Sequence, residues 1–460
     1  MEKREEYNGS LLEGGYKIKT YKRRWIILIL YMIYNAVGSF QWIAYSSITN
    51  LVVKYYGVSS MVVDWTSIAY NAIYPLFVVP ASYIIDKEGL RTAGVYGCIL
   101  TCAGTTLKLF SFHPDRFYIV GIGQVVLAIA NVLVACLPSK LAAVWFGPDE
   151  ITIACSLGVF GSQIGVALGY IVPPLVVNNH DSAETIGIGF HNLTWMLTLI
   201  IVPVTICILF YFPSQPQMPP SITQAKIRDS KDDFTNEAFF SSLKDLCTNK
   251  AFLVLMVAYG INIGVYSAVS TLLNQIILQY YEDVDSDVGI MGCIMVISGL
   301  CGAILFSIIL DKTHKFRIIT VVIYLCSIAS IVSFMFALES RIKLLTYVTC
   351  ALVGFFTTAF MPVGFEYAME LTYPAEESTT SGLLMAMTQI MGVVFTISLG
   401  FLNLELGSFW ALSSQAGLLI IGALVNFFVP NNMLLRQEAL RMMNSHTLEH
   451  HRSSRLVYIQ

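Results

Sequence analysis

The hexapeptide SYIIDK (82–87) has a counterpart in SIILDK (307–312), 225 residues further along the chain. A second pair of turns, FGPDE (146–150) and YPAE (373–376), recurs at an offset of 226 residues. Two matches at nearly one offset, each lying between long apolar segments, indicate an internal duplication. The sequence therefore predicts two halves of similar size and architecture.

The composition identifies the solvent of this chain as a lipid bilayer. Hydrophobic residues make up 56% of the 460 residues, charged residues only 12%, and the mean hydropathy is +0.67. Soluble globular domains carry about 25% charged residues. The formal net charge of −3 gives no basic surface for nucleic acid, so we expect no nucleic-acid partner.

The apolar segments are long enough for an all-α membrane protein with 12 transmembrane helices, because a span needs about 20 apolar residues. We predict an N-terminal tail (1–24), a first six-helix half (25–212), a linker (213–250), a second half (251–430) and a C-terminal tail (431–460). The predicted spans are 25–49, 62–85, 92–112, 117–138, 151–175, 192–212, 251–280, 288–310, 317–338, 344–367, 378–402 and 409–429.

The distribution of basic residues predicts the orientation. Twenty-two of the 27 Lys and Arg residues fall on one side when the N-terminus is placed inside. Cytoplasmic loops are enriched in Lys and Arg, so both termini are predicted to be cytoplasmic.

Polar and aromatic side chains within the apolar segments are the candidates for function, because they are costly inside a membrane. The 226-residue offset relates Gln163 to Gln389, and an offset of 225 relates Trp42 to Ser267, which follows Tyr266. Aromatic and amide side chains without a formal charge suit a compact cation bound by ring faces, such as a quaternary ammonium group. The predicted substrate-binding residues are Trp42, Tyr45, Gln163, Tyr266, Ser267, Asn274, Gln275 and Gln389.

Four carboxylates are predicted to act in gating. Asp86 and Asp311 occupy the repeated turns, where they can meet a helix N-terminus and lock one state. Asp64 opens the second span as a helix N-cap or a gate residue. Glu366 lies near the inner end of the tenth span, a position that favours an inner gate or a helix-end hydrogen bond over a proton relay.

Other functions fit the sequence less well. A haem carrier could use the outer histidines His113, His180 and His191 together with Lys108, although the spans offer no core histidine for iron. A receptor without transport would need more elaborate outer loops. We expect no enzyme activity, cofactor or metal, because no nucleophile, base and metal-ligand constellation appears.

Several segments resemble the feline leukaemia virus subgroup C receptor-related (FLVCR) transporters, which belong to the major facilitator superfamily. The repeated Asp-Lys turns also resemble that superfamily's loop signature. The segments that carry the family resemblance are FQW (40–42), VDW (63–65), LPSK (137–140), VWFGP (144–148), STLLNQ (270–275), GFE (364–366) and SGLL (381–384).

The resemblance implies the major facilitator superfamily fold and transport of choline and ethanolamine, with haem as the other assignment. It implies a location in the plasma membrane, with a mitochondrial or other organellar membrane as the alternative, and it implies Trp42 as a choline-cage residue and Gln163 and Gln389 as cavity glutamines. We expect a monomer in the lipid bilayer. The family's tyrosine on the seventh span aligns with Ser267, whereas Tyr266 precedes it by one residue. One residue turns a helix by about 100°, so this wall departs from the family pattern.

Overall fold

The computed structural model describes residues 5–7, 10–13, 16–135, 137–147, 150–177, 183–220, 243–281, 284–372 and 377–430. Within these residues 12 helices are long and apolar enough to cross a membrane, which confirms the predicted all-α membrane fold. A small antiparallel sheet, with strand order β1-β2-β3, precedes the first helix. Its strands are β1 (Glu5–Tyr7), β2 (Ser10–Glu13) and β3 (Tyr16–Ile18).

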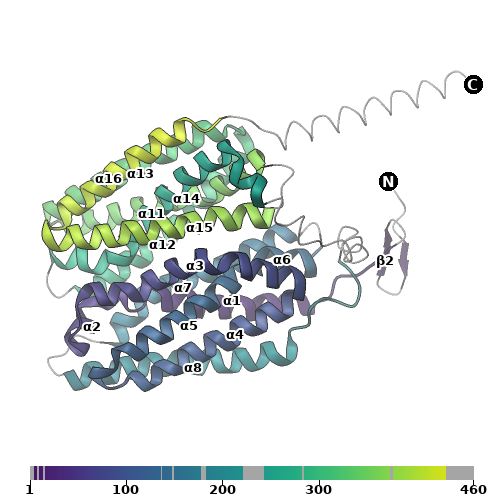
Figure 1. Ribbon diagram of the computed structural model, residues 1–460, viewed down its shortest axis with the longest axis horizontal. Coiled ribbons are helices and arrows are strands. Elements are labelled where there is room, and N and C mark those ends of the chain that lie inside the picture. Colours follow the sequence, from purple (N-terminus) through teal and green to yellow (C-terminus); the bar gives the residue numbers. More distant parts are fainter. Residues whose placement is uncertain are drawn as a thin grey trace, which may run out of the picture.

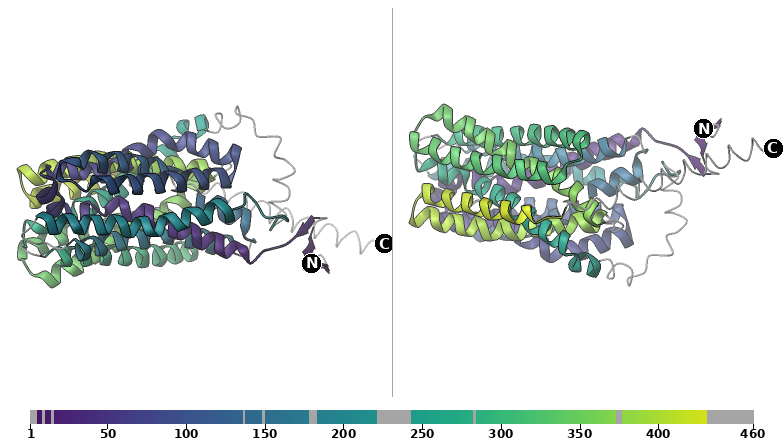
Figure 2. Two further views of the ribbon diagram at one scale, coloured as in Figure 1. Left: turned by 90° about the horizontal axis from the view of Figure 1, so that it is seen from below. Right: turned by 90° about the horizontal axis from the view of Figure 1, so that it is seen from above.

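The helices form two groups that lie side by side in Figure 1 and run along one long axis in Figure 2. The first group is α1 (Arg23–Ile43), η1 (Ser46–Ile48), α2 (Thr49–Tyr56), α3 (Ser60–Glu88), α4 (Leu90–Leu107), η2 (Lys108–Ser111), η3 (Pro114–Arg116), α5 (Phe117–Ala135), α6 (Leu137–Trp145), α7 (Ile151–Val176) and α8 (Ala183–Tyr211). The second is α11 (Lys250–Leu278), α12 (Asp285–Thr313), α13 (Phe316–Ser340), α14 (Lys343–Thr372), α15 (Glu377–Glu405) and α16 (Ser408–Phe427).

The packing repeats between the two groups. In the first, α1 packs on α7, α3 on α5, and α4 on α8. In the second, α11 packs on α15, α12 on α14, and α13 on α16, so each half pairs its first span with its fifth, its second with its fourth and its third with its sixth. The halves meet through α7 with α12 and α3 with α15, which are again equivalent pairs. The duplication seen in the sequence therefore extends to the packing.

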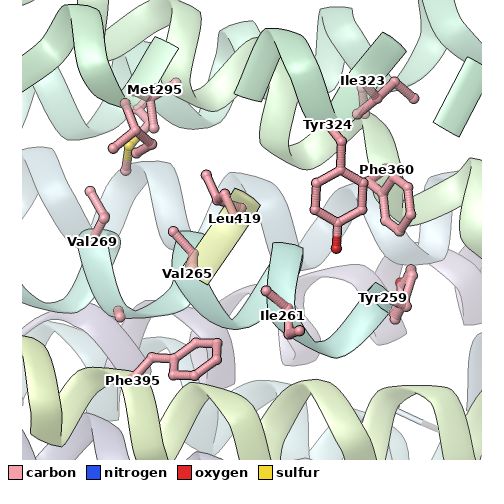
Figure 3. Packing of buried hydrophobic residues seen from close by; sticks show 14 of the residues in the cluster. Tyr259, Ile261, Val265, Val269, Met295, Ile323, Tyr324, Phe360, Phe395 and Leu419 are labelled. Carbon is pink, nitrogen blue, oxygen red and sulfur yellow. The ribbon is translucent and has the colours of Figure 1, made fainter. Parts of the chain in front are cut away.

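Close helix approach depends on glycine. A Cβ added at Gly165 of α7 would collide with the backbone of Ala36 on α1, and one at Gly302 of α12 would collide with the backbone of Phe355 on α14. Small residues let helix backbones approach inside membranes, where van der Waals packing takes over from the hydrophobic effect. Larger side chains fill the remaining space, as Figure 3 shows for Tyr259, Tyr324 and Phe360 in the second half.

Two predicted spans differ from the structure. The first span is not one helix to residue 49, because α1 ends at Ile43 and the chain continues through η1 into α2. The sixth span begins at Ala183 instead of residue 192, so His191 lies inside α8. Gly187 and Gly189 lower the helix propensity of this stretch, but they pack against Tyr55 and the end of α7, and tertiary packing overrides propensity.

We expect Gly165→Leu to destabilise the protein by about 1–3 kcal/mol, because the larger side chain would force α1 and α7 apart. Thermal unfolding of the purified protein in detergent would measure the loss. Gly121→Leu is the matched control, since no atom lies within 4 Å of a Cβ added there. Equal melting temperatures for the two variants would contradict the assigned role of Gly165.

Candidate functional site

A cavity of about 350 Å³ lies between the two halves. Its walls come from α1, α3, α5, α6 and α7 of the first half and from α11, α14 and α15 of the second. The remaining long helices, α4, α8, α12 and α13, contribute no residue that lines it, and neither does α16. The cavity therefore lies on the axis that relates the halves.

The lining residues extend toward one end of the bundle. We call the end where α1 begins and α16 ends the terminal end, and the opposite end, where α2 lies, the far end (Figure 1). The lining reaches the terminal end at Ile85, Lys140 and Ser381. The deepest lining residues on α1, α11 and α15 are Trp42, Ser267 and Gln389. The cavity thus has a mouth near the terminal end and a blind end at the level of these residues.

Five of the eight predicted substrate-binding residues line this cavity. They are Trp42, Gln163, Tyr266, Ser267 and Gln389. Tyr266 and Ser267 both line it, although they are neighbours on α11 and point about 100° apart. The positions related by the internal duplication therefore face a common space.

The other three predicted substrate-binding residues lie outside the cavity lining. Tyr45 follows α1 and stacks on Phe190 of α8, with ring centroids 6.3 Å apart. Asn274 Nδ2 donates to the backbone oxygen of Ser47 at 3.0 Å. Gln275 Nε2 donates to Asp64 Oδ1 at 2.6 Å. In this state Asn274 and Gln275 join the halves beyond the blind end, and Tyr45 packs within the first half.

The predicted gating residues are differently placed. Asp64 is the fifth residue of α3 and is 5% exposed, so it is not the N-cap, a position that Ser59 occupies. Glu366 lies near the terminal end of α14. The side chains of Asp86 and Asp311 lie outside the described residues. Asp64 accepts the hydrogen bond from Gln275 that joins the two halves.

The cavity wall also contains residues that were not selected from the sequence. Asn35, Tyr70, Asn71, Tyr74 and Asn131 line it. Each interrupts an apolar run, which was the available signal. At the duplication offset, only Asn131 among these five has a polar counterpart, Thr357. Their contribution becomes visible only when the helices are packed.

Trp42 is held where α1 ends. Ser47 Oγ donates to the oxygens of Ala44 and Gly169, each at 3.0 Å, and Ser67 Oγ donates to the oxygen of Trp42 at 2.6 Å. A backbone carbonyl released from a helix inside a membrane needs such a donor. The indole Nε1 of Trp42 is buried and has no hydrogen-bond partner in the described structure. The serines therefore fix the backbone of Trp42 and leave its indole N–H available.

A buried lysine lies behind this wall. Lys108 is 3% exposed, and its Nζ donates to Gln41 Oε1 at 3.1 Å and to Gln124 Oε1. Its Nζ also lies 5.1 Å from the centroid of the Tyr45 ring. Gln124 Nε2 in turn donates to the backbone oxygens of Gln41 and Thr66, each at 3.0 Å. This network ties α1 to α3, η2 and α5 next to Trp42.

The cavity lining is nearly free of charge. Lys140 near the mouth is the one charged side chain among the described lining residues, and its Nζ donates to the oxygen of Ile85 at 2.7 Å. The rest of the polar lining is made of amides and hydroxyl groups. A positively charged ligand in this cavity would therefore meet ring faces and dipoles in place of a carboxylate.

Comparison with known proteins agrees with this geometry. A family model described as Major Facilitator Superfamily matches residues 27–396. An uncharacterized MFS-type transporter of Caenorhabditis elegans is 38% identical over 93% of this chain and 73% of its own. The choline/ethanolamine transporter flvcr2a of Danio rerio is 36% identical over 92% of this chain and 89% of its own. The crystal structure of a D-xylose-proton symporter shares the fold, with a TM-score of 0.69 and 10% identity over 89% of this chain and 98% of its own.

We expect Lys108→Ala to lower the thermal stability of the purified protein, because the buried side-chain oxygens of Gln41 and Gln124 would lose their donor, at about 1–3 kcal/mol for each group left unsatisfied. Lys54→Ala is the control, since Lys54 lies in the last turn of α2 outside this network. An unchanged melting temperature for Lys108→Ala would show that the network does not hold the wall of Trp42.

Proposed function

We propose, on the premise that this chain belongs to the major facilitator superfamily and to its FLVCR-related branch, that it carries choline, ethanolamine or a closely related small organic cation. The observation that carries the proposal is the central cavity, whose described lining combines aromatic rings and amides without a carboxylate. The two curated relatives' names agree with a transporter, and one of them names choline and ethanolamine.

The cavity chemistry fits such a ligand. Its aromatic lining consists of Tyr31, Trp42, Tyr70, Tyr74, Tyr266 and Phe365. A ring face attracts a cation by about 0.5–2 kcal/mol, the upper value applying when water is excluded. A quaternary ammonium group has no N–H donor and gains most from such faces, while a primary ammonium can also donate to the oxygens of Gln163 and Gln389.

The arrangement of the halves supports alternating access. At the far end, Asn50 Nδ2 donates to Asp285 Oδ1 at 2.8 Å, and Gln275 donates to Asp64. At the other end, the cavity lining extends to the terminal end of the bundle at Ile85 and Lys140. With the terminal end in the cytoplasm, as the basic residues predict, this state opens inward. Breaking the far-end contacts while closing the mouth would expose the same cavity outward.

A haem carrier is the weaker alternative. His191 Nε2 accepts a hydrogen bond from Trp195 Nε1 at 2.8 Å, His113 lies 3.4 Å from Asp115, and His180 lies outside the described residues. Neither described histidine lines the cavity, and Lys108 is buried behind it. The cavity's neutral amides also offer little to the two carboxylates of haem.

We further propose that the protein works as a facilitative monomer in the plasma membrane, with both termini in the cytoplasm. The chain is a multi-pass membrane protein by its 12 candidate spans and its family. The asymmetry of the basic residues supports the orientation. Each half completes the cavity wall of the other, so a single chain suffices for the site.

We expect Trp42→Ala to lower uptake of labelled choline by about 30-fold at a substrate concentration well below KM, the effect of losing about 2 kcal/mol of desolvated cation–π attraction. Trp42→Phe should retain part of the activity. Trp195→Ala on α8 is the control, because Trp195 is 43% exposed and does not line the cavity. Wild-type uptake in Trp42→Ala, at matched surface expression, would refute the proposed site.

We expect Gln275→Leu to increase outside access to the cavity by about tenfold, because removing about 1.4 kcal/mol of hydrogen bonding to Asp64 would weaken the closed far end. The measurement is the rate at which an impermeant maleimide labels Ser270→Cys from outside, relative to the chain without that thiol. Gln279→Leu is the matched control, since Gln279 bonds Asn403 and Ser408 within the second half. Equal rates for the two variants would argue against a gate at Gln275.

A further inference from the structure

One hydrogen bond between the halves lies in the cavity wall itself. Asn71 Nδ2 of α3 donates to Ser267 Oγ of α11 at 3.1 Å, and both residues line the cavity. Asn71 is 3% exposed and Ser267 is 9% exposed. The bonds of Asn50 with Asp285 and of Gln275 with Asp64 lie closer to the far end and outside the lining. A ligand that reaches the blind end therefore meets the Asn71–Ser267 pair.

A glycine on α15 leaves room at this pair. A Cβ added at Gly392 would lie 3.0 Å from Asn71 Nδ2 and 3.3 Å from Ser267 Oγ, which is tighter than most real Cβ contacts. Gln389 lines the cavity one turn earlier on the same helix. The blind end is therefore a small polar seat next to the aromatic wall of Trp42.

The pair can bond a hydroxyl group in both directions. When Asn71 donates one amide hydrogen to Ser267, the amide oxygen of Asn71 can still accept and the hydroxyl proton of Ser267 can still be donated. A ligand hydroxyl can donate to the first and accept from the second. An alkyl group in the same place would leave these buried groups unpaired, at a cost of about 1–3 kcal/mol.

We propose that Asn71 and Ser267 determine the substrate preference of this chain by binding the hydroxyl end of a short amino alcohol whose ammonium group lies against Trp42. The proposal rests on the proposed function and assigns the residues that bind the hydroxyl group of its substrate. In this arrangement the hydroxyl group binds the polar pair of Asn71 and Ser267, and the ammonium group binds the aromatic ring of Trp42.

The test compares choline with propyltrimethylammonium, in which a methyl group replaces the hydroxyl. Uptake of each labelled compound is measured in cells expressing the wild-type chain or the double variant Asn71→Leu/Ser267→Ala. We expect the wild type to prefer choline by about tenfold in kcat/KM, the size of one buried hydrogen-bonding loss. The double variant should lose this preference and take up propyltrimethylammonium at least as well as the wild type, which also shows that it is folded.

Two single variants sharpen the result. Gly392→Ala crowds the pair without removing a polar group, so it should reduce the choline preference by a smaller factor. Ser330→Ala is the matched control, because Ser330 is a buried serine of α13 that bonds the oxygen of Ser327 and lies outside the cavity lining. Its preference should equal that of the wild type.

Different outcomes would contradict the role of the Asn71–Ser267 pair and the proposed transport function. Equal uptake of both compounds by the wild type, or an unchanged preference in the double variant, would overturn the assignment of the pair. Absence of choline and ethanolamine uptake by the wild type at normal surface expression would instead refute the proposed function.

Discussion

Backbone groups that leave a helix inside a bilayer have no water to bond, and the site of this protein depends on how one such break is satisfied. α1 ends at Ile43, one residue after Trp42, and hydroxyl groups take up the released carbonyls. Ser67 bonds the oxygen of Trp42, and Ser47 bonds those of Ala44 and Gly169. The break therefore anchors α1 to α3 and α7 where the cavity ends. The serines that interrupt the apolar sequence after Trp42 therefore hold its backbone at the cavity wall.

The symmetry of the two halves explains where the cavity lies. Each half pairs its first span with its fifth, and the halves touch through two equivalent pairs, α7 with α12 and α3 with α15. Helices that cross in this way can be close at one end and apart at the other. In this state the hydrogen bonds between the halves gather beyond the blind end, where Tyr170 of α7 also donates to the oxygen of Ser270 at 2.7 Å. The Asn71–Ser267 pair lines the cavity and also joins the two halves. A ligand bound at the blind end would therefore contact a hydrogen bond that holds the halves together.

The sequence predicted the parts of this structure that depend on local pattern. Apolar length gave the 12 spans, and the two repeated turns gave the halves. The same offset directed attention to Trp42, Gln163, Ser267 and Gln389, all of which line the cavity. It could not predict the break in α1, because that break is stabilised by groups of α3 and α7, far away in the chain. Nor could it select Asn71, whose partner is 196 residues away and whose counterpart at the duplication offset is apolar.

The buried lysine and the buried aspartate of the described structure lie outside the cavity lining. Lys108 is enclosed by amides behind Trp42, and Asp64 is bonded to Gln275 at the far end. Under the proposed function, a permanently charged ligand would meet no carboxylate among the described lining residues and would cross the membrane as a net positive charge. The membrane potential then acts on the substrate itself, by about 2.3 kcal/mol per charge for 100 mV, which corresponds to an accumulation ratio of about 50. A cavity without a carboxylate would thus let the membrane potential concentrate a cation on its negative side without a coupling ion, in line with the facilitative mechanism that we propose.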